Sequence, residues 1–77
     1  MSKHNIEECI TRSLEKYFRD LGGEQPTGIY DMVVQTVEKP MLEVVMQQAN
    51  NNQSLASDML GINRNTLRKK LQQHGLL

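Results

Sequence analysis

Apolar residues recur at three- and four-residue spacing over two long stretches of the chain. This spacing places them on one face of an α-helix. The first stretch covers residues 5–21, and its stripe runs from Ile6 to Leu21. The second covers residues 29–49. Gly22 and Gly23 fall between the stretches and favour a helix end, so the pattern predicts two long helices joined by a connection.

The second long helix contains Pro40 near its middle. Proline removes one backbone donor and crowds the preceding turn, which favours a kink. The apolar stripe stays in phase across Pro40, so we expect one kinked helix and not two helices. Val34 and Leu42 lie off the main stripe and widen the apolar band. A helix with such a wide band must be buried on more than one side, and we expect a second copy of the chain to provide the extra cover.

The C-terminal part predicts two short helices, residues 53–60 and 64–73, separated by Gly61. Asparagines at 50–52 and at 63 favour helix N-caps. Gly61 allows the tight turn of a helix-turn-helix, and the small Ser57 lets the two helices cross closely. The positions expected to face inward are Leu55, Ala56, Met59 and Leu60 on the first helix and Leu67 and Leu71 on the second.

The outer face of the last predicted helix is polar and cationic. It carries Arg64, Asn65, Thr66, Arg68, Lys69 and Lys70. A helix of this width fits the major groove of B-DNA, and its N-terminus can hold a phosphate. Arg64 and Arg68 could reach guanine edges or phosphates, whereas Lys69 and Lys70 suit phosphates.

Length and composition favour an oligomer. The chain has 77 residues, of which 38% are hydrophobic and only three are aromatic, and so small a domain is marginal as a monomer. The lone Cys9 cannot form an intrachain disulfide, and the cysteine and the two histidines lack the spacing of a zinc site. The short apolar runs exclude a membrane span. These features predict a cytoplasmic protein.

Charge is distributed unevenly. Residues 1–50 carry five Lys and Arg against eight Asp and Glu, whereas residues 51–77 carry four against one. The basic C-terminal end favours a polyanion as partner. His4 and His74 have no carboxylate neighbour in the sequence, so we expect them to be exposed to solvent.

No catalytic chemistry is indicated. The chain shows no nucleophile–base pair, metal cluster or phosphate loop, so we expect neither an enzyme nor a bound cofactor, metal or small-molecule substrate. A protein–protein adaptor whose basic end binds an acidic partner remains an alternative. The two can be separated by measuring the affinity of the protein for duplex DNA in the presence of excess acidic polymer. A protein that binds DNA specifically keeps this affinity, whereas an adaptor for acidic partners loses it.

Three segments resemble one known family. They are Asn51–Ser54, the run GINRNTLRKKL at residues 61–71, and residues 38–46 with their internal proline. These segments resemble the Fis family, bacterial nucleoid-associated proteins that bend DNA and are related to the C-terminal domain of NtrC-type activators. With Tyr17 and Phe18 included, the resemblance covers almost the whole chain from residue 6.

The resemblance implies an all-α fold, with four helices per protomer and an intertwined homodimer. Within a single domain of residues 1–77, residues 6–49 would form the dimerisation core and residues 50–77 the helix-turn-helix unit. Because the paired recognition helices of the family lie closer than one DNA turn, the DNA must bend, and degenerate sites are read partly by shape. The residues expected in the dimer core are Val33, Val37, Met41, Val44 and Val45.

The resemblance also implies a set of DNA contacts. These are Asn52, Ser54, Asn63, Arg64, Thr66, Arg68, Lys69 and Lys70, with Arg64 reading a guanine and Asn52 and Ser54 holding flanking phosphates. The implied function is transcription regulation on the nucleoid. A stand-alone NtrC-type effector domain and a repressor with a single operator are alternatives within DNA binding.

The chain departs from the family at both ends. Well-known members carry a further N-terminal β-hairpin that contacts DNA invertases, whereas here only residues 1–5 precede the first predicted helix. Contact with an invertase is therefore not implied. Gln72 and Gln73 stand where lysines are expected, so the C-terminal tail is less basic.

Overall fold

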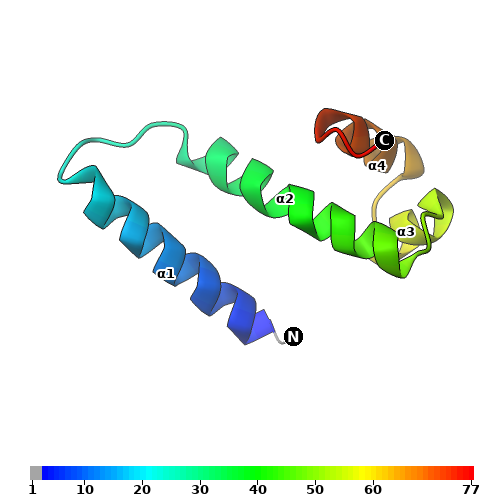
Figure 1. Ribbon diagram of the computed structural model, residues 1–77, viewed down its shortest axis with the longest axis horizontal. Helices are drawn as coiled ribbons and strands as arrows, with labels where there is room; N and C mark the ends of the chain where they lie inside the picture. Colours follow the sequence, from blue (N-terminus) through cyan, green and yellow to red (C-terminus); the bar gives the residue numbers. More distant parts are fainter. Residues whose placement is uncertain (1–2) are drawn as a thin grey trace.

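Four helices make up the fold of the part of the chain that the structure describes. The computed structural model describes residues 3–77 and shows α1 at Lys3–Leu21, α2 at Ile29–Gln48, α3 at Gln53–Leu60 and α4 at Arg64–Gln73, with no strand in this range (Figure 1). The predicted all-α class is confirmed. The two short helices have the predicted bounds, and the long ones differ from them only at their ends. None of the described helices is long and apolar enough to cross a membrane.

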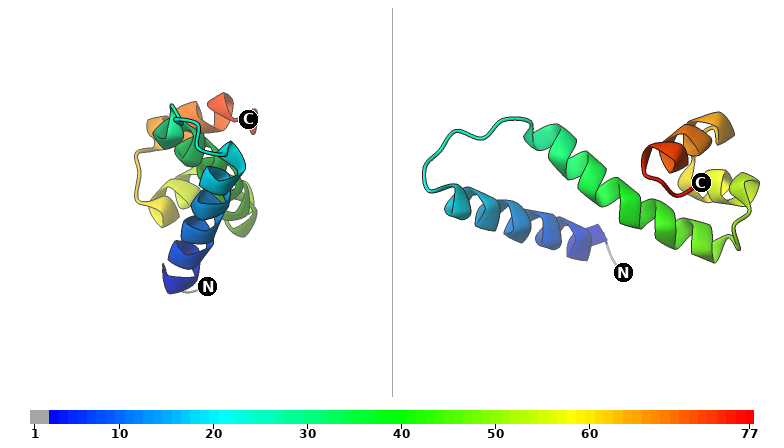
Figure 2. Two further views of the ribbon diagram at one scale, coloured as in Figure 1. Left: turned by 90° about the vertical axis from the view of Figure 1, so that its left-hand side faces the viewer. Right: turned by 45° about the horizontal axis from the view of Figure 1, so that its top comes forward.

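The two long helices form an antiparallel hairpin. Gly22 and Gly23 follow α1 with φ angles of 61° and 92°, a left-handed conformation that glycine adopts without a steric penalty. α2 continues through Pro40 without interruption, which confirms the prediction of one helix there. In Figure 1 and in the right-hand view of Figure 2, α1 and α2 run alongside each other in opposite directions.

The core lies where the second half of α2 meets α3 and α4. Its buried members are Leu42, Ala49, Ala56, Leu67 and Leu71, and Val45, Met46, Leu60, Ile62 and Leu76 pack against them. Leu42, which lies off the main apolar stripe, is completely buried. Leu42, Val45 and Ala49 therefore mark an inner face of α2, which packs on the helix-turn-helix unit.

The inward positions of α3 differ from the prediction. Leu55 and Met59 are 45% and 51% exposed, so the prediction was wrong for these two residues. The buried positions are the small Ala56 and Ser57, with Leu60 half-buried. α3 packs against both α2 and α4, and small side chains allow this close approach on two sides.

The opposite face of α2 and all of α1 bury much less surface. No residue of α1 is buried, and Ile6 and Phe18 are each 49% exposed. On α2, Val37, Met41 and Val44 are 38%, 44% and 55% exposed. We call these three residues, with the half-buried Val33, the outer face of α2.

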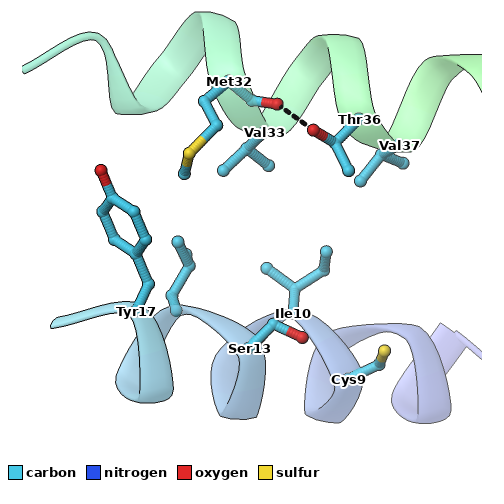
Figure 3. A pocket seen from close by; sticks show the side chains of 9 residues that line it. Cys9, Ile10, Ser13, Tyr17, Met32, Val33, Thr36 and Val37 are labelled. Carbon is cyan, nitrogen blue, oxygen red and sulfur yellow. Dashed lines mark hydrogen bonds between the residues drawn. The ribbon is translucent and has the colours of Figure 1, made fainter. Parts of the chain in front are cut away.

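A groove of about 350 Å³ separates the two long helices. Figure 3 shows Ile10 and Tyr17 pointing from α1 toward Met32, Val33 and Val37 of α2 across this groove. Most of the side chains that line the groove are apolar, so it exposes hydrophobic surface that the single chain leaves uncovered.

Candidate nucleic-acid interface

The first short helix begins at a side-chain cap. The Oδ1 atom of Asn52 accepts a hydrogen bond from the backbone N–H of Leu55 at 3.1 Å, which satisfies one of the free donors at the start of α3. The Asn50 and Asn51 residues before it both adopt positive φ angles, 53° and 63°, a conformation that asparagine tolerates better than most side chains. The cap fixes where α3 leaves α2.

The turn between α3 and α4 is closed by backbone hydrogen bonds. Gly61 has a φ angle of 73°, and its N–H and that of Ile62 donate to the carbonyl of Ser57 at 2.9 and 3.1 Å. Ser57 is 5% exposed, and its hydroxyl donates to the carbonyl of Ser54 at 2.8 Å. The predicted roles of Gly61 in the turn and of the small Ser57 in close packing agree with this geometry.

The last helix, α4, also begins at a side-chain cap. The Oδ1 atom of Asn63 accepts a hydrogen bond from the N–H of Asn65 at 2.7 Å. Leu67 and Leu71 point inward and are 0% and 1% exposed. The first turn of α4 therefore meets solvent while its inner side is anchored in the core.

A polar and cationic surface covers the outer side of α4. Its exposed members are Asn63, Arg64, Asn65, Thr66, Arg68 and Lys69, and we call this set the basic face. Three of these side chains carry a positive charge, and no acidic residue occurs within α4. Such a surface attracts a polyanion by long-range electrostatics.

Arg64 is oriented by the neighbouring helix. Its Nη1 atom donates a hydrogen bond to the hydroxyl of Ser54 at 2.7 Å, and both residues are exposed. This bond joins the start of α3 to the start of α4, and it brings together Ser54 and Arg64, which are ten positions apart in the sequence.

Lys70 does not lie on the exposed basic face. Its Nζ atom donates to Oε2 of Glu38, on α2, at 2.8 Å, and its side chain is 34% exposed. Nε2 of His74 lies 2.8 Å from Oε1 of the same carboxylate, and the His74 side chain is only 7% exposed. Because an ionised carboxylate only accepts hydrogen bonds, Nε2 carries the proton in this contact. The prediction that His74 is exposed and lacks a carboxylate partner was wrong.

Glu38 is the centre of this cluster. It is 8% exposed, and its two oxygens receive hydrogen bonds from Lys70 on α4 and from His74, the residue that follows α4. The hydrogen bond from Lys70, followed by that from His74, holds the pKa of Glu38 below its ordinary value of 4.5, although burial acts in the opposite direction. We call Glu38, Lys70 and His74 the α2–α4 tether.

The sequence contained a signal for the tether that our predictions did not use. Glu38 precedes Leu42 by four residues and Val45 by seven, which places a carboxylate in line with the inner apolar face of α2. A charged residue at such a position is buried only when it is paired. Among residues 3–77, no group of three or more His, Cys, Asp or Glu side chains has a geometry that could hold a metal ion.

Comparison with known proteins gives a family. Residues 33–74 match the family described as "Bacterial regulatory protein, Fis family". The chain is 68% identical over its 77 residues to the Fis-like DNA-binding protein of Ralstonia nicotianae, and the match covers the whole of both chains. It is 63% identical to the protein of the same name from Neisseria meningitidis serogroup A over 73 residues, covering 95% of this chain and 92% of that protein.

More distant relatives carry the family name itself. The DNA-binding protein Fis of Glaesserella parasuis is 45% identical over 71 residues, which cover 92% of this chain and 72% of that protein. The matched region contains the capped helix-turn-helix and the basic face of α4. The chain therefore belongs to the Fis family of bacterial regulatory proteins.

Proposed function

We propose that this protein is a homodimer that binds and bends double-stranded DNA and regulates transcription on the bacterial nucleoid, in the cytoplasm. The basic face of α4 is the observation that carries the proposal. It is exposed and cationic, and it begins at the free N–H groups beyond the Asn63 cap. The names of the relatives, DNA-binding proteins of the Fis family, support the same assignment.

Base reading in this proposal belongs to the start of α4. Arg64 stands in the first turn, where a recognition helix meets base edges. A guanidinium can grip O6 and N7 of guanine with two parallel hydrogen bonds. The bond from Arg64 to Ser54 limits the directions that the side chain samples before DNA arrives, which lowers the entropy cost of binding.

The residues proposed to contact phosphates lie near Arg64. Arg68 lies one turn beyond Arg64, and Lys69 follows it on the exposed side of the helix. Asn52 and Ser54 stand at the start of α3, where their polar groups can meet the backbone of a flanking strand. Asn63 and Thr66 complete the proposed DNA contacts.

Dimerisation in the proposal uses the surfaces that the single chain leaves open. The outer face of α2 and the groove beside α1 are apolar and partly exposed. Large contiguous apolar patches on a protein surface mark interaction sites. A second copy would cover Val37, Met41 and Val44 and would bring a second α4 into the assembly.

Bending follows in the proposal from the spacing of the two recognition helices. Adjacent major-groove segments on one side of B-DNA are about 34 Å apart. In the arrangement implied by the family, the two α4 helices lie closer than this. Both would reach a groove only if the DNA bends, and bending is easier at flexible steps. Central base pairs that no side chain touches would then affect affinity.

A gel-shift titration against circularly permuted duplexes tests binding and bending together. We expect a retarded complex whose mobility depends on the position of the site, because a bend near the middle of a fragment slows it most. A complex whose mobility is the same for all permutations contradicts bending, and the absence of a complex contradicts DNA binding. A genome-wide occupancy map then separates many degenerate sites from a single operator.

A further inference from the structure

We propose that Glu38 withholds Lys70 from DNA, so that Lys70 binds the protein's own α2 helix while its neighbours Arg68 and Lys69 remain available to phosphates. This inference rests on the proposed DNA binding and goes further, because it divides the cations of α4 into two functional classes. Glu38 is then a positioning residue for α4, although it lies on α2 and makes no contact with DNA in the proposed complex.

The geometry places Lys70 in a site built for its charge. The Glu38 carboxylate side chain is 10% exposed and receives Lys70 on one oxygen and His74 on the other, both at 2.8 Å. Removing Lys70 from this site would leave the buried carboxylate with His74 as its one remaining side-chain partner among residues 3–77. A buried charge that loses its partner is strongly destabilised, so this cost opposes any move of Lys70 toward DNA.

The neighbouring cations stand in a different environment. Arg68 and Lys69 are exposed, and neither side chain makes a hydrogen bond or ion pair within residues 3–77. An exposed, unpaired ammonium loses little when it binds a phosphate, and it releases a condensed counterion from the DNA. Lys69 and Lys70 are adjacent in the sequence, yet they differ in the cost of reaching a phosphate.

Besides the tether, α2 and α4 are joined by apolar contacts and by an exposed hydrogen bond from Nε2 of Gln73 to Oε1 of Gln35 at 3.5 Å. Glu38 lies more than one helical turn before Leu42 on α2, and His74 is the C-cap of α4. Apolar packing is not directional. The hydrogen bonds of Lys70 and His74 to Glu38, in contrast, fix the distance and direction from α2 to the C-terminal half of α4. The tether therefore holds the orientation in which α4 presents its basic face.

The slope of log affinity against log salt concentration measures this division directly. Each phosphate that a cation neutralises contributes about 0.9 to the slope, so one contact per protomer contributes about 1.8 in a homodimer. The probe is a duplex of about 30 base pairs with an A/T-rich centre, titrated with the full chain at several salt concentrations. Circular dichroism of each variant verifies that the helices are retained.

Lys69→Gln and Lys70→Gln form a matched pair at adjacent positions. We expect Lys69→Gln to reduce the slope by about 1.8 and Lys70→Gln to reduce it by less than about 0.5. We also expect Glu38→Gln to increase the slope, because it releases Lys70 toward phosphates, and this increase should disappear in the double variant Glu38→Gln/Lys70→Gln. The double variant removes both charges of the pair. It therefore still tests the contribution of Lys70 to the slope if Lys70→Gln alone fails to fold.

Three outcomes overturn the inference. The first is a Lys70→Gln variant whose slope falls as far as that of Lys69→Gln. The second is a Glu38→Gln variant with the wild-type slope. The third is an increase in slope for Glu38→Gln that persists in the double variant. If the wild-type protein binds the duplex with no salt dependence, and Lys69→Gln changes nothing, the proposed DNA binding by α4 fails as well, and this pattern is distinct from the other three.

Discussion

The C-terminal unit and the N-terminal hairpin of this small protein reach very different degrees of burial. α3, α4 and the inner face of α2 enclose Leu42, Leu67 and Leu71, each exposed by 1% or less. α1 has no buried residue, and the outer face of α2 leaves Val44 55% exposed. The single chain therefore completes one core and leaves the other half open.

The two faces of α2 therefore differ in what covers them. The inner face is satisfied within the chain, by apolar contacts and by the tether to α4. The outer face, with its apolar groove, lacks cover within the residues that the structure describes. Because apolar burial is the main favourable contribution to folding, we expect the hairpin to depend on a second copy far more than the C-terminal unit does.

The largest expected effect comes from a charge on the outer face of α2. In Val37→Glu the new carboxylate would be buried without a partner in the homodimer, at a cost of about 3–5 kcal/mol per copy. We expect loss of the dimer and of most helical structure, measured by sedimentation and circular dichroism. Lys39→Glu, at an exposed position of the same helix, is the control and should remain dimeric. A dimeric Val37→Glu protein would contradict the proposed interface.

A truncation in the C-terminal core should cost less, and by a different route. Leu67 is fully buried between α4 and its neighbours, and replacing a buried leucine with alanine typically costs about 2–5 kcal/mol. We expect Leu67→Ala to lower the free energy of unfolding in urea by this amount while the protein keeps its oligomeric state. A Leu67→Ala protein as stable as the wild type would show that the core of the single chain is not what holds α4.

Much of the fold was accessible from the sequence, because it rests on local signals. The helical period, the Asn52 and Asn63 caps and Gly61 at the turn each act within a few residues, and they located α3 and α4 correctly. The exposure of Leu55 and Met59 was missed, because the orientation of an eight-residue helix is decided by the two helices that pack on it.

The candidate site was harder to predict where it depends on tertiary contacts. The pairing of Glu38 with Lys70 and His74 joins residues separated by 32 and 36 positions. No local rule connects residues at that separation, and the pairing exists only once α4 has packed against α2. The bond from Arg64 to Ser54 depends in the same way on the turn that brings α3 and α4 together.

Replacing an exposed arginine of the C-terminal unit should change DNA recognition without changing the stability of the fold. A bidentate contact between arginine and guanine provides about 1–3 kcal/mol of discrimination. We expect Arg64→Ala to lose this preference at one base pair in each half-site while its urea midpoint stays close to that of the wild type. Competition titrations with duplexes substituted at single positions measure the effect. Uniform weakening on all sequences would make Arg64 a phosphate contact only.

The smallest expected effect is a change in how the stability of the protein depends on pH. The pKa of Glu38 is lowered in the folded protein by Lys70 and then by His74, so its ionised form contributes stability above the unfolded pKa of about 4.5. That contribution is lost as the pH falls through the lower, folded pKa. We expect Glu38→Gln to be less stable than the wild type near neutral pH and the difference in Tm to shrink on acidification. A difference in Tm that is independent of pH would contradict the ion pair.

The dependence of unfolding on protein concentration tests the central claim most directly, that the open half of this chain is completed by a second copy. For a dimer that unfolds to two separate chains, each tenfold increase in concentration adds about 1.4 kcal/mol to the apparent stability. We predict that the urea midpoint of the full chain rises steadily with concentration and that sedimentation of the folded protein gives twice the chain mass. A midpoint that is independent of concentration, together with a folded species of single-chain mass, would contradict the account.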